Sequence, residues 1–201
     1  MSSILDCPRH ICAFFHNRDE EYRWLVEFVR DGIDTGDRCF HVVDAKYRPR
    51  HRQRLIEGGI DVQSLEEKGQ LEILGWDSTY LVDGAFNETK MLAMIDGVLT
   101  DSRTRGFPRT RFYGSMVWAV ENQLSLKDFI HFEARVNDVI SRHDDPVACG
   151  YDLTRFDGST IVDAMRTHPT LVIGDVVQQN PFYIGPDEMI AEFRGRSGAP
   201  H

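Results

Sequence analysis

The chain has 201 residues, 41% of them hydrophobic, and a formal net charge of −9. The acidic balance argues against direct binding of nucleic acid, which depends on clustered Lys and Arg. No apolar run approaches the roughly 20 residues of a membrane-spanning helix and no N-terminal signal pattern is present, so we expect no membrane role and a cytoplasmic location.

Apolar runs rich in Val, Ile and Phe alternate with segments of helical period. This alternation predicts βα units around a mostly parallel sheet with helices on both faces, which is an α/β fold. The predicted strands are Ile11–Phe15, Cys39–Val43, Leu71–Leu74, Arg111–Val120, Val147–Tyr151 and Leu171–Ile173. The predicted helices follow N-capping side chains at Asn17, Asn87, Ser125 and Ser159. We expect one domain over 9–190, an N-terminal extension at 1–8 and a flexible polar tail at 191–201.

The first predicted strand runs into a helix without a glycine-rich phosphate loop. Where that loop would surround phosphates with backbone N–H groups, the chain reads His-Asn-Arg-Asp-Glu-Glu from His16 to Glu21. Acidic side chains at this place repel a polyphosphate. The junction therefore favours a sensor over a nucleotide hydrolase.

Chemically capable side chains stand on or beside several predicted strands. Ligands of open α/β sheets bind outside the carboxyl ends of the strands, so these side chains are candidates for a small-molecule site. Core packing is the alternative explanation for the aromatic ones. The candidate ligand-binding residues are His10, Cys12, Trp76, Tyr80, Met116, Trp118, Glu133, Cys149, Tyr151, Asp152 and His168.

The scattered cysteines indicate reduced thiols rather than a disulfide framework. His10 and Cys12 lie two residues apart, which places them on the same face of a strand. With Cys149 and His168 they form a Cys2His2 zinc cluster if the first and fifth strands are neighbours. Two core cysteines and two hydrogen-bonded histidines explain the same residues. We therefore expect no cofactor, with zinc at these four residues as the alternative.

Two further features need partners. Glu133 lies on the apolar face of its predicted helix, where a buried carboxylate needs Tyr151, His168 or Arg111 beside it. The segment 46–54 is strongly basic in an acidic chain. It is either a solvated helix start or a site for an acidic partner surface or a phosphate.

The order and spacing of several short motifs resemble the MEDS domain, a sensory domain found in a dichloromethane-responsive regulator and in methanogen and methylotroph signalling proteins. The resemblance implies a RecA-like or KaiC-like three-layer α/β sandwich with a degenerate phosphate loop, and a role in sensing small molecules, proposed for simple hydrocarbon derivatives. Ser115 stands where the family pattern Gly-Glu-Met-x-Trp has glutamate, so no carboxylate role is carried over to it. The motifs lie at 10–15, 20–21, 32–44, 114–118, 133, 149–152, 168–169 and 181–183.

We expect a non-enzymatic sensory or regulatory module that binds a small organic ligand at the strand-end crevice. Members of the family usually carry an output domain, for which this chain has no room after Tyr183. We therefore expect signalling in trans to a histidine kinase, a sigma-factor regulator or a transcription factor, with a homodimer as one form, or a chain that is one domain of a longer protein.

Two alternatives remain open. One is an enzyme, either a residual nucleotide hydrolase that uses Asp152 or a thiol enzyme that pairs Cys149 or Cys12 with His168 or His10. The other is a ligand-free docking platform for a kinase or a sigma-factor regulator.

Overall fold

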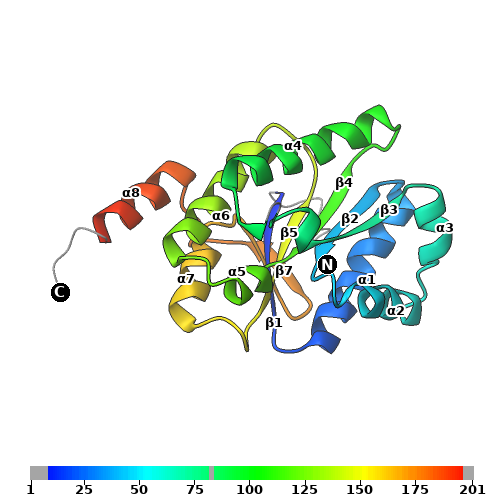
Figure 1. Ribbon diagram of the computed structural model, residues 1–201, viewed down its shortest axis with the longest axis horizontal. Coiled ribbons are helices and arrows are strands. Elements are labelled where there is room, and N and C mark those ends of the chain that lie inside the picture. Colours follow the sequence, from blue (N-terminus) through cyan, green and yellow to red (C-terminus); the bar gives the residue numbers. More distant parts are fainter. Residues whose placement is uncertain (1–8, 82–83, 197–201) are drawn as a thin grey trace.

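A computed structural model describes residues 9–81 and 84–196 (Figure 1). The expected α/β three-layer sandwich is confirmed. The strands are β1 (His10–Phe15), β2 (Arg38–Val43), β3 (Leu71–Gly75), β4 (Thr110–Ser115), β5 (Val147–Asp152), β6 (Thr170–Ile173) and β7 (Val176–Gln179). They form one sheet in the order β3-β2-β4-β5-β1-β6-β7, in which β7 pairs antiparallel with β6 and the other described pairs are parallel.

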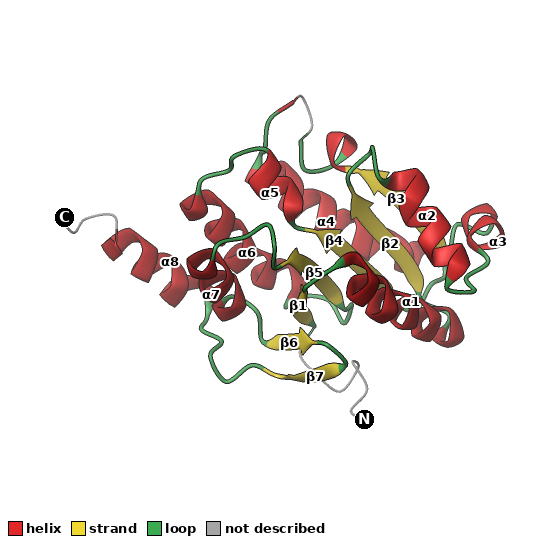
Figure 2. Ribbon diagram, turned by 90° about the horizontal axis from the view of Figure 1, so that it is seen from below, coloured by secondary structure: helices red, strands yellow, loops and turns green. Residues whose placement is uncertain are grey.

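Helices cover both faces of the sheet (Figures 1 and 2). They are α1 (Arg18–Thr35), α2 (Arg48–Glu57), α3 (Val62–Glu67), η2 (Trp76–Ser78), α4 (Glu88–Thr104), α5 (Val117–Glu121), α6 (Leu126–Ile140), α7 (Gly158–Arg166) and α8 (Pro186–Arg196). Apolar residues of α1, α2 and α3 pack on one face, and those of α4 to α8 pack on the other. No described helix is long and apolar enough to cross a membrane.

The strands alternate between these two cores, because successive side chains of a strand point to opposite faces. In β1, Cys12 and Phe14 face the core beneath α6, whereas Ile11, Ala13 and Phe15 face α1. His10 lies on the same face as Cys12, as predicted, since it contacts α6 through Asn137. One face of β1 thus points toward α6.

Side-chain caps start the main helices. Asn17, Asn87 and Ser125 each accept a hydrogen bond from the backbone N–H three residues ahead, as predicted. Helix α7 is different, because Asp157, and not Ser159, caps it by accepting from the Thr160 N–H. At the far end of α1, Gly36 adopts a φ of 77°, a left-handed conformation that glycine adopts without strain.

Three element predictions are wrong. The strand predicted over 111–120 ends at Ser115 and gives way to the short helix α5, because a continuous apolar run does not distinguish a buried strand from a buried helix. Strand β7 was not expected, since its residues are largely exposed and carry little apolar signal. Residues 191–196 continue α8, which Phe193 anchors in the core. The extension predicted at 1–8 and the last five residues of the predicted tail lie outside the described residues.

Candidate functional site

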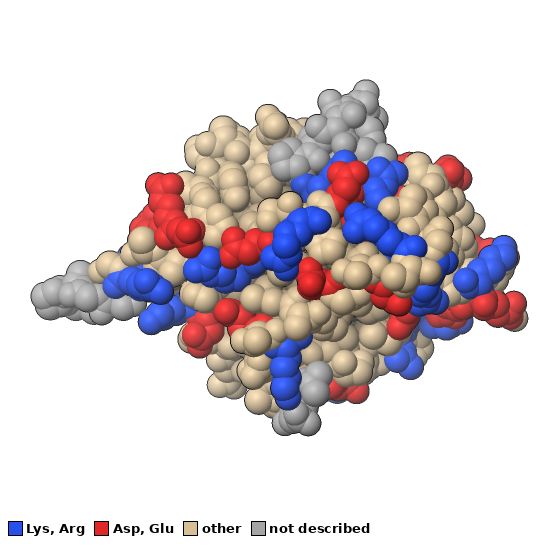
Figure 3. All heavy atoms as spheres, turned by 90° about the horizontal axis from the view of Figure 1, so that it is seen from above, with Lys and Arg blue, Asp and Glu red and all other residues tan. Residues whose placement is uncertain are grey.

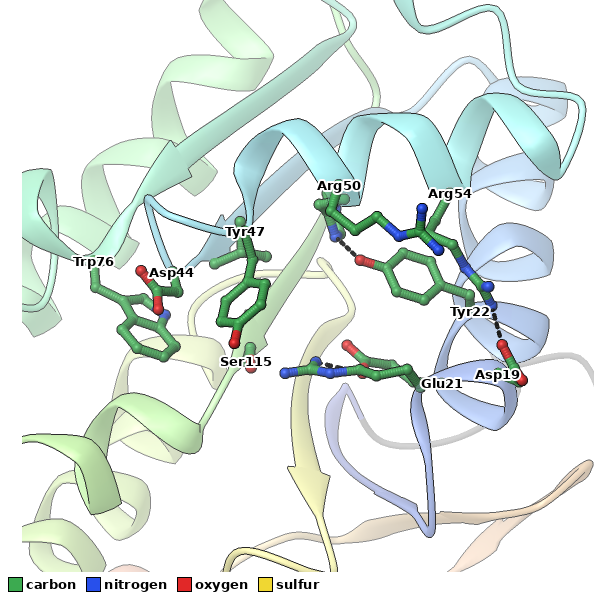
Figure 4. Close-up of a pocket in the computed structure, with 12 residues that line it drawn as sticks. Asp19, Glu21, Tyr22, Asp44, Tyr47, Arg50, Arg54, Trp76 and Ser115 are labelled. Atoms are coloured by element: carbon green, nitrogen blue, oxygen red, sulfur yellow. Dashed lines mark hydrogen bonds and ion pairs between the residues drawn. The ribbon is translucent and has the colours of Figure 1, made fainter.

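A pocket with a volume of about 260 Å³ opens at the carboxyl ends of β2, β3 and β4 and beside the first turns of α1 (Figure 4). We call it the strand-end pocket. Four segments of the chain contribute its walls, because parallel strands deliver their following loops to the same edge of the sheet. The lining residues are Arg18, Asp19, Glu21, Tyr22, Val43, Asp44, Tyr47, Arg50, His51, Arg54, Trp76 and Ser115.

The start of α1 uses its own side chains to satisfy its N-terminal backbone. The Asn17 side chain accepts from the Glu20 N–H at 3.0 Å, and the Glu20 carboxylate accepts from the His16 N–H at 2.8 Å. Asp19 and Glu21 add negative charge to the same turn. The structure therefore agrees with the sequence that this junction is not a phosphate-binding loop.

Most charges in the strand-end pocket are paired within it. Arg18 donates to the Glu21 carboxylate at 2.6 Å, and Arg54 donates to Asp19 at 2.6 Å. Arg50 is different, because it makes no hydrogen bond or ion pair with the described part of the chain. The Trp76 Nε1 is also without a hydrogen-bond partner among the described residues, although Trp76 is only 6% exposed. The pocket thus offers two donors, one cationic and one neutral.

A chain of hydrogen bonds backs the wall of the pocket. The Tyr22 hydroxyl lies 2.7 Å from His51 Nδ1, and His51 Nε2 lies 2.9 Å from His41 Nδ1. Burial lowers the pKa of His41 to about 3 and also lowers the pKa of His51, to which the neighbouring His41 and Arg18 contribute. Both imidazoles are therefore neutral at physiological pH, and the positive charge of the pocket comes from its arginines.

A second group of polar residues lies under α6, on the face of β1 and β5 that carries His10. His10, Glu133, Cys149 and His168 are all buried, and one ligand atom from each lies within 4.8 Å of the others. We call this group the buried polar cluster. The Glu133 Oε2 lies 3.2 Å from His168 Nε2 and 3.6 Å from His10 Nε2, and Cys149 Sγ lies 3.6 Å from His10 Nε2.

The buried polar cluster corrects the predicted zinc set. Strands β1 and β5 are neighbours, as that hypothesis required, and Cys12 is aligned with Cys149. The fourth member is nevertheless Glu133 rather than Cys12, because α6 lies over the two strands and delivers the carboxylate. His168 is one of the three partners predicted for Glu133, beside Tyr151 and Arg111, and its Nε2 lies 3.2 Å from Glu133 Oε2. It precedes β6, so it lies at the amino end of the strands and not at the carboxyl-end crevice where we had placed it.

The other candidates are distributed differently from the prediction. Trp76 lines the strand-end pocket, whereas Tyr80, Met116, Trp118 and Tyr151 are buried in the core under α4 and α6. Tyr80 stacks on Trp118, with ring centroids 4.6 Å apart. The Asp152 carboxylate accepts from the backbone and hydroxyl of Thr154 in its own turn.

Several residues of the strand-end pocket were not singled out by sequence reasoning. Two signals pointed toward them, namely the acidic junction after the first strand and the basic segment 46–54. The first carries Glu21 and the second carries Arg50 and Arg54. Neither signal shows that the two segments face each other across a hollow, as they do in Figure 4.

Acidic and basic side chains are interspersed on the face of the molecule seen in Figure 3. Many charged side chains of the described residues are paired at the surface of the protein, for example Arg155 with Glu121 and Arg135 with Asp138. This face therefore presents no broad basic patch of the kind that binds a nucleic-acid backbone.

Comparison with known proteins gives two matches. The family model of the methanogen/methylotroph, DcmR sensory domain, abbreviated MEDS, matches residues 9–169. The chain is also similar to the transcriptional repressor DcmR of Methylorubrum extorquens, with 25% identity over 161 residues that cover 79% of this chain. The same residues cover 57% of the repressor, so this chain matches little more than half of that protein.

Proposed function

The chain belongs to the MEDS family of sensory domains, and on that premise we propose that it is a regulatory module that binds a small organic ligand in the strand-end pocket. The observation that carries the proposal is a pair of donors, Arg50 and the Trp76 Nε1, that have no partner in the described part of the chain and line a pocket of about 260 Å³. The Trp76 Nε1 is buried, and a buried polar group without a partner costs free energy that a ligand acceptor recovers. Arg50 is exposed and contributes a positive charge to the same pocket. The similarity to a transcriptional repressor supports a regulatory role.

The walls of the pocket suggest the class of ligand. Trp76 and Arg50 lie on either side of Tyr47 in the pocket (Figure 4). A carboxylate would pair with Arg50, and a short carbon skeleton would lie against Tyr47 and reach toward Trp76. A polyphosphate is disfavoured by Asp19, Glu21 and Asp44 in the same walls. We therefore propose an oxygenated derivative of a short hydrocarbon, with a small organic acid as the leading candidate.

Ligand binding in this pocket would influence a partner through the elements that form it. Helices α1 and α2 and the ends of three strands meet there, so a ligand that prefers one arrangement of α2 shifts the population of that arrangement. We propose that a signalling protein or an attached output domain responds to this shift.

The experiment is a thermal-shift and calorimetric screen with probes of defined chemistry: formate, acetate and glycolate, the alcohols with the same carbon skeletons, and inorganic phosphate. A ligand at about 100 times its Kd adds about 2.7 kcal/mol to the free energy of unfolding. We expect a carboxylate to raise the melting temperature and an alcohol or phosphate to raise it less.

Matched variants locate the effect. Arg50→Ala and Trp76→Phe, which removes the N–H but keeps a ring, should weaken the response. Arg48→Ala on the same helix and Trp118→Phe in the core should keep it, since neither residue lines the pocket. A response that survives both Arg50→Ala and Trp76→Phe would refute this pocket. The absence of a response to every probe would favour a ligand-free docking platform.

A thiol enzyme is less well supported. Cys149 Sγ lies 3.6 Å from His10 Nε2, as such an enzyme requires. However, burial and the nearby Glu133 carboxylate raise the pKa of Cys149. In the metal-free chain a buried thiol with a raised pKa is a poor nucleophile.

A further inference from the structure

The buried polar cluster contains a carboxylate whose hydrogen-bonding capacity the described residues leave unfilled. Glu133 is completely buried, and neither of its side-chain oxygens has a hydrogen-bond partner among the described residues. Removing an ionised carboxylate from water is costly unless a counter-charge or hydrogen bonds compensate for it. Glu133 Oε2 lies 3.2 Å from His168 Nε2 and 3.6 Å from His10 Nε2, and the Tyr151 hydroxyl and the Cys149 thiol also lie close enough to interact with the carboxylate.

The hydrogen bonds on the opposite side of each ring determine which nitrogen carries the proton. His168 Nδ1 lies 2.7 Å from the Ala164 carbonyl oxygen, which can only accept. His10 Nδ1 lies 3.1 Å from Asn137 Oδ1, and the amide of Asn137 is oriented by its donation to the Thr167 carbonyl at 2.8 Å. Both Nδ1 atoms are therefore donors, so in the neutral rings both Nε2 atoms present lone pairs to the Glu133 carboxylate.

Two imidazole lone pairs, a carboxylate and the Cys149 thiol thus converge on one small volume, and within residues 9–81 and 84–196 no Lys or Arg pairs with Glu133. Three of the six separations lie near the edges of a tetrahedron around a metal ion, and all six are within 4.8 Å. With metal–nitrogen and metal–oxygen bonds of about 2.0 Å and a metal–sulfur bond of about 2.3 Å, the N···O edges are about 3.3 Å and the S···N edges about 3.5 Å. The observed N···O separations are 3.2 and 3.6 Å, and the S···N separation is 3.6 Å.

We propose that His10, Glu133, Cys149 and His168 bind one zinc ion. Imidazole nitrogen, thiolate sulfur and carboxylate oxygen are the three donor types that zinc takes in proteins, and four of them complete its coordination. The hydrogen bonds of Asn137 and Ala164 to the imidazoles are the outer-shell contacts that orient metal-binding histidines.

The site would be structural rather than catalytic. All four donors belong to the protein and are at most 5% exposed, so no coordination position remains for water or substrate. The ion would link β1, β5, α6 and the residue before β6, which are separated by up to 158 positions in sequence. Binding would therefore be coupled to folding, and exchange from the folded chain would be slow. This site is independent of the strand-end pocket and of the function proposed there.

The test is the zinc content of tag-free protein by elemental mass spectrometry, followed by unfolding with a chelator and refolding with Co²⁺. We expect about one zinc per chain as isolated. After refolding with cobalt we expect the visible bands of a tetrahedral Co²⁺ site and a thiolate-to-cobalt charge-transfer band. Cys149→Ala should abolish the charge-transfer band, and Glu133→Gln and His168→Gln should each lower zinc retention at least tenfold in competition with a chelator.

Cys12→Ala is the matched control, because Cys12 is an equally buried thiol aligned with Cys149 on the neighbouring strand. It should keep the metal and the charge-transfer band. If circular dichroism shows that Cys149→Ala does not fold, the proposal is tested by the cobalt spectrum of the wild type and by the zinc retention of Glu133→Gln in competition with a chelator. Wild-type protein that takes up neither zinc nor cobalt on refolding would overturn the proposal, as would a cobalt spectrum without a thiolate band or a band that depends on Cys12.

Discussion

The Tyr113 hydroxyl of β4 donates to the Glu21 carboxylate of α1 at 2.6 Å, and this contact joins the sheet to the helix that borders the strand-end pocket. The other oxygen of Glu21 accepts from Arg18. Glu21 is only 4% exposed, so its charge depends on these two donors. The wall of the pocket is therefore held by a buried polar contact and not only by apolar packing.

Tyr113→Phe should destabilise the fold by about 1.5–3 kcal/mol, because it removes a hydrogen bond to a buried charged group. Urea unfolding at neutral pH measures the change. Tyr183→Phe is the control, since it removes the same oxygen from a partly exposed ring and should change stability by less than about 0.5 kcal/mol. Equal effects of the two variants would show that the contact with Glu21 contributes nothing specific.

Asp37 should be among the least replaceable charged residues of the fold. Its carboxylate is fully buried and accepts from Arg111 at 3.1 Å and from Arg109 at 3.1 Å. Asp37→Asn leaves the buried Arg111 guanidinium without its counter-charge and should cost about 3–5 kcal/mol in chemical denaturation. The exposed pair of Arg9 and Asp144 provides the comparison, and Asp144→Asn should cost at most about 1 kcal/mol. A small effect of Asp37→Asn would mean that Arg111 finds another acceptor.

The three described cysteines should be inert toward thiol reagents in the folded protein. Cys12, Cys39 and Cys149 are all buried, and burial raises the pKa of each thiol. In a Cys7→Ser background, a disulfide reagent should react with them only as fast as the protein unfolds, and all three should react in denaturant. Rapid labelling of Cys149 under native conditions would instead favour the thiol-enzyme alternative.

Much of the fold was predictable because it depends on local signals. Short stretches of sequence identify the apolar strands and the capping residues Asn17, Asn87 and Ser125. In the structure these three side chains cap their helices as predicted. The carboxyl end of β4 was not predictable, because the apolar run continues from the strand into α5 and is compatible with either a buried strand or a buried helix. Strand β7 carries no comparable signal, because it pairs at the edge of the sheet with its side chains largely exposed.

The candidate sites were predictable only in part, because they depend on which elements become neighbours. The spacing of His10 and Cys12 predicts that both lie on the same face of β1. It does not predict that α6 packs over this face and places Glu133 beside His10. Likewise, the basic segment 46–54 is visible in the sequence, whereas its position across a pocket from Glu21 follows from the strand order. The sequence thus shows which residues could form a site, but the strand order and helix placement determine which of them become neighbours in space.

The stability of the protein should fall as the pH drops below about 6.5, and His41 should account for part of the loss. Its folded pKa is about 3, against 6.5 for an unperturbed histidine, because burial disfavours the charged ring. Between these values the unfolded chain binds a proton that the folded chain does not, so the contribution of His41 is fully present above pH 6.5 and is lost as the pH falls. From pH 7.5 to pH 5, one such histidine removes about 2 kcal/mol.

Urea unfolding of the wild type and of His41→Gln at these two pH values tests this effect. The variant keeps a polar group beside His51 but cannot take up a proton, so its stability should decrease by about 2 kcal/mol less than that of the wild type over the same interval. The neighbouring His51 titrates in both proteins, and because His41 contributes to lowering its pKa, the difference between the two proteins reports the hydrogen-bonded histidine pair. Identical pH dependence in the two proteins would show that the His41 ring is charged in the folded state, and the hydrogen-bonded chain behind the strand-end pocket would then carry a positive charge.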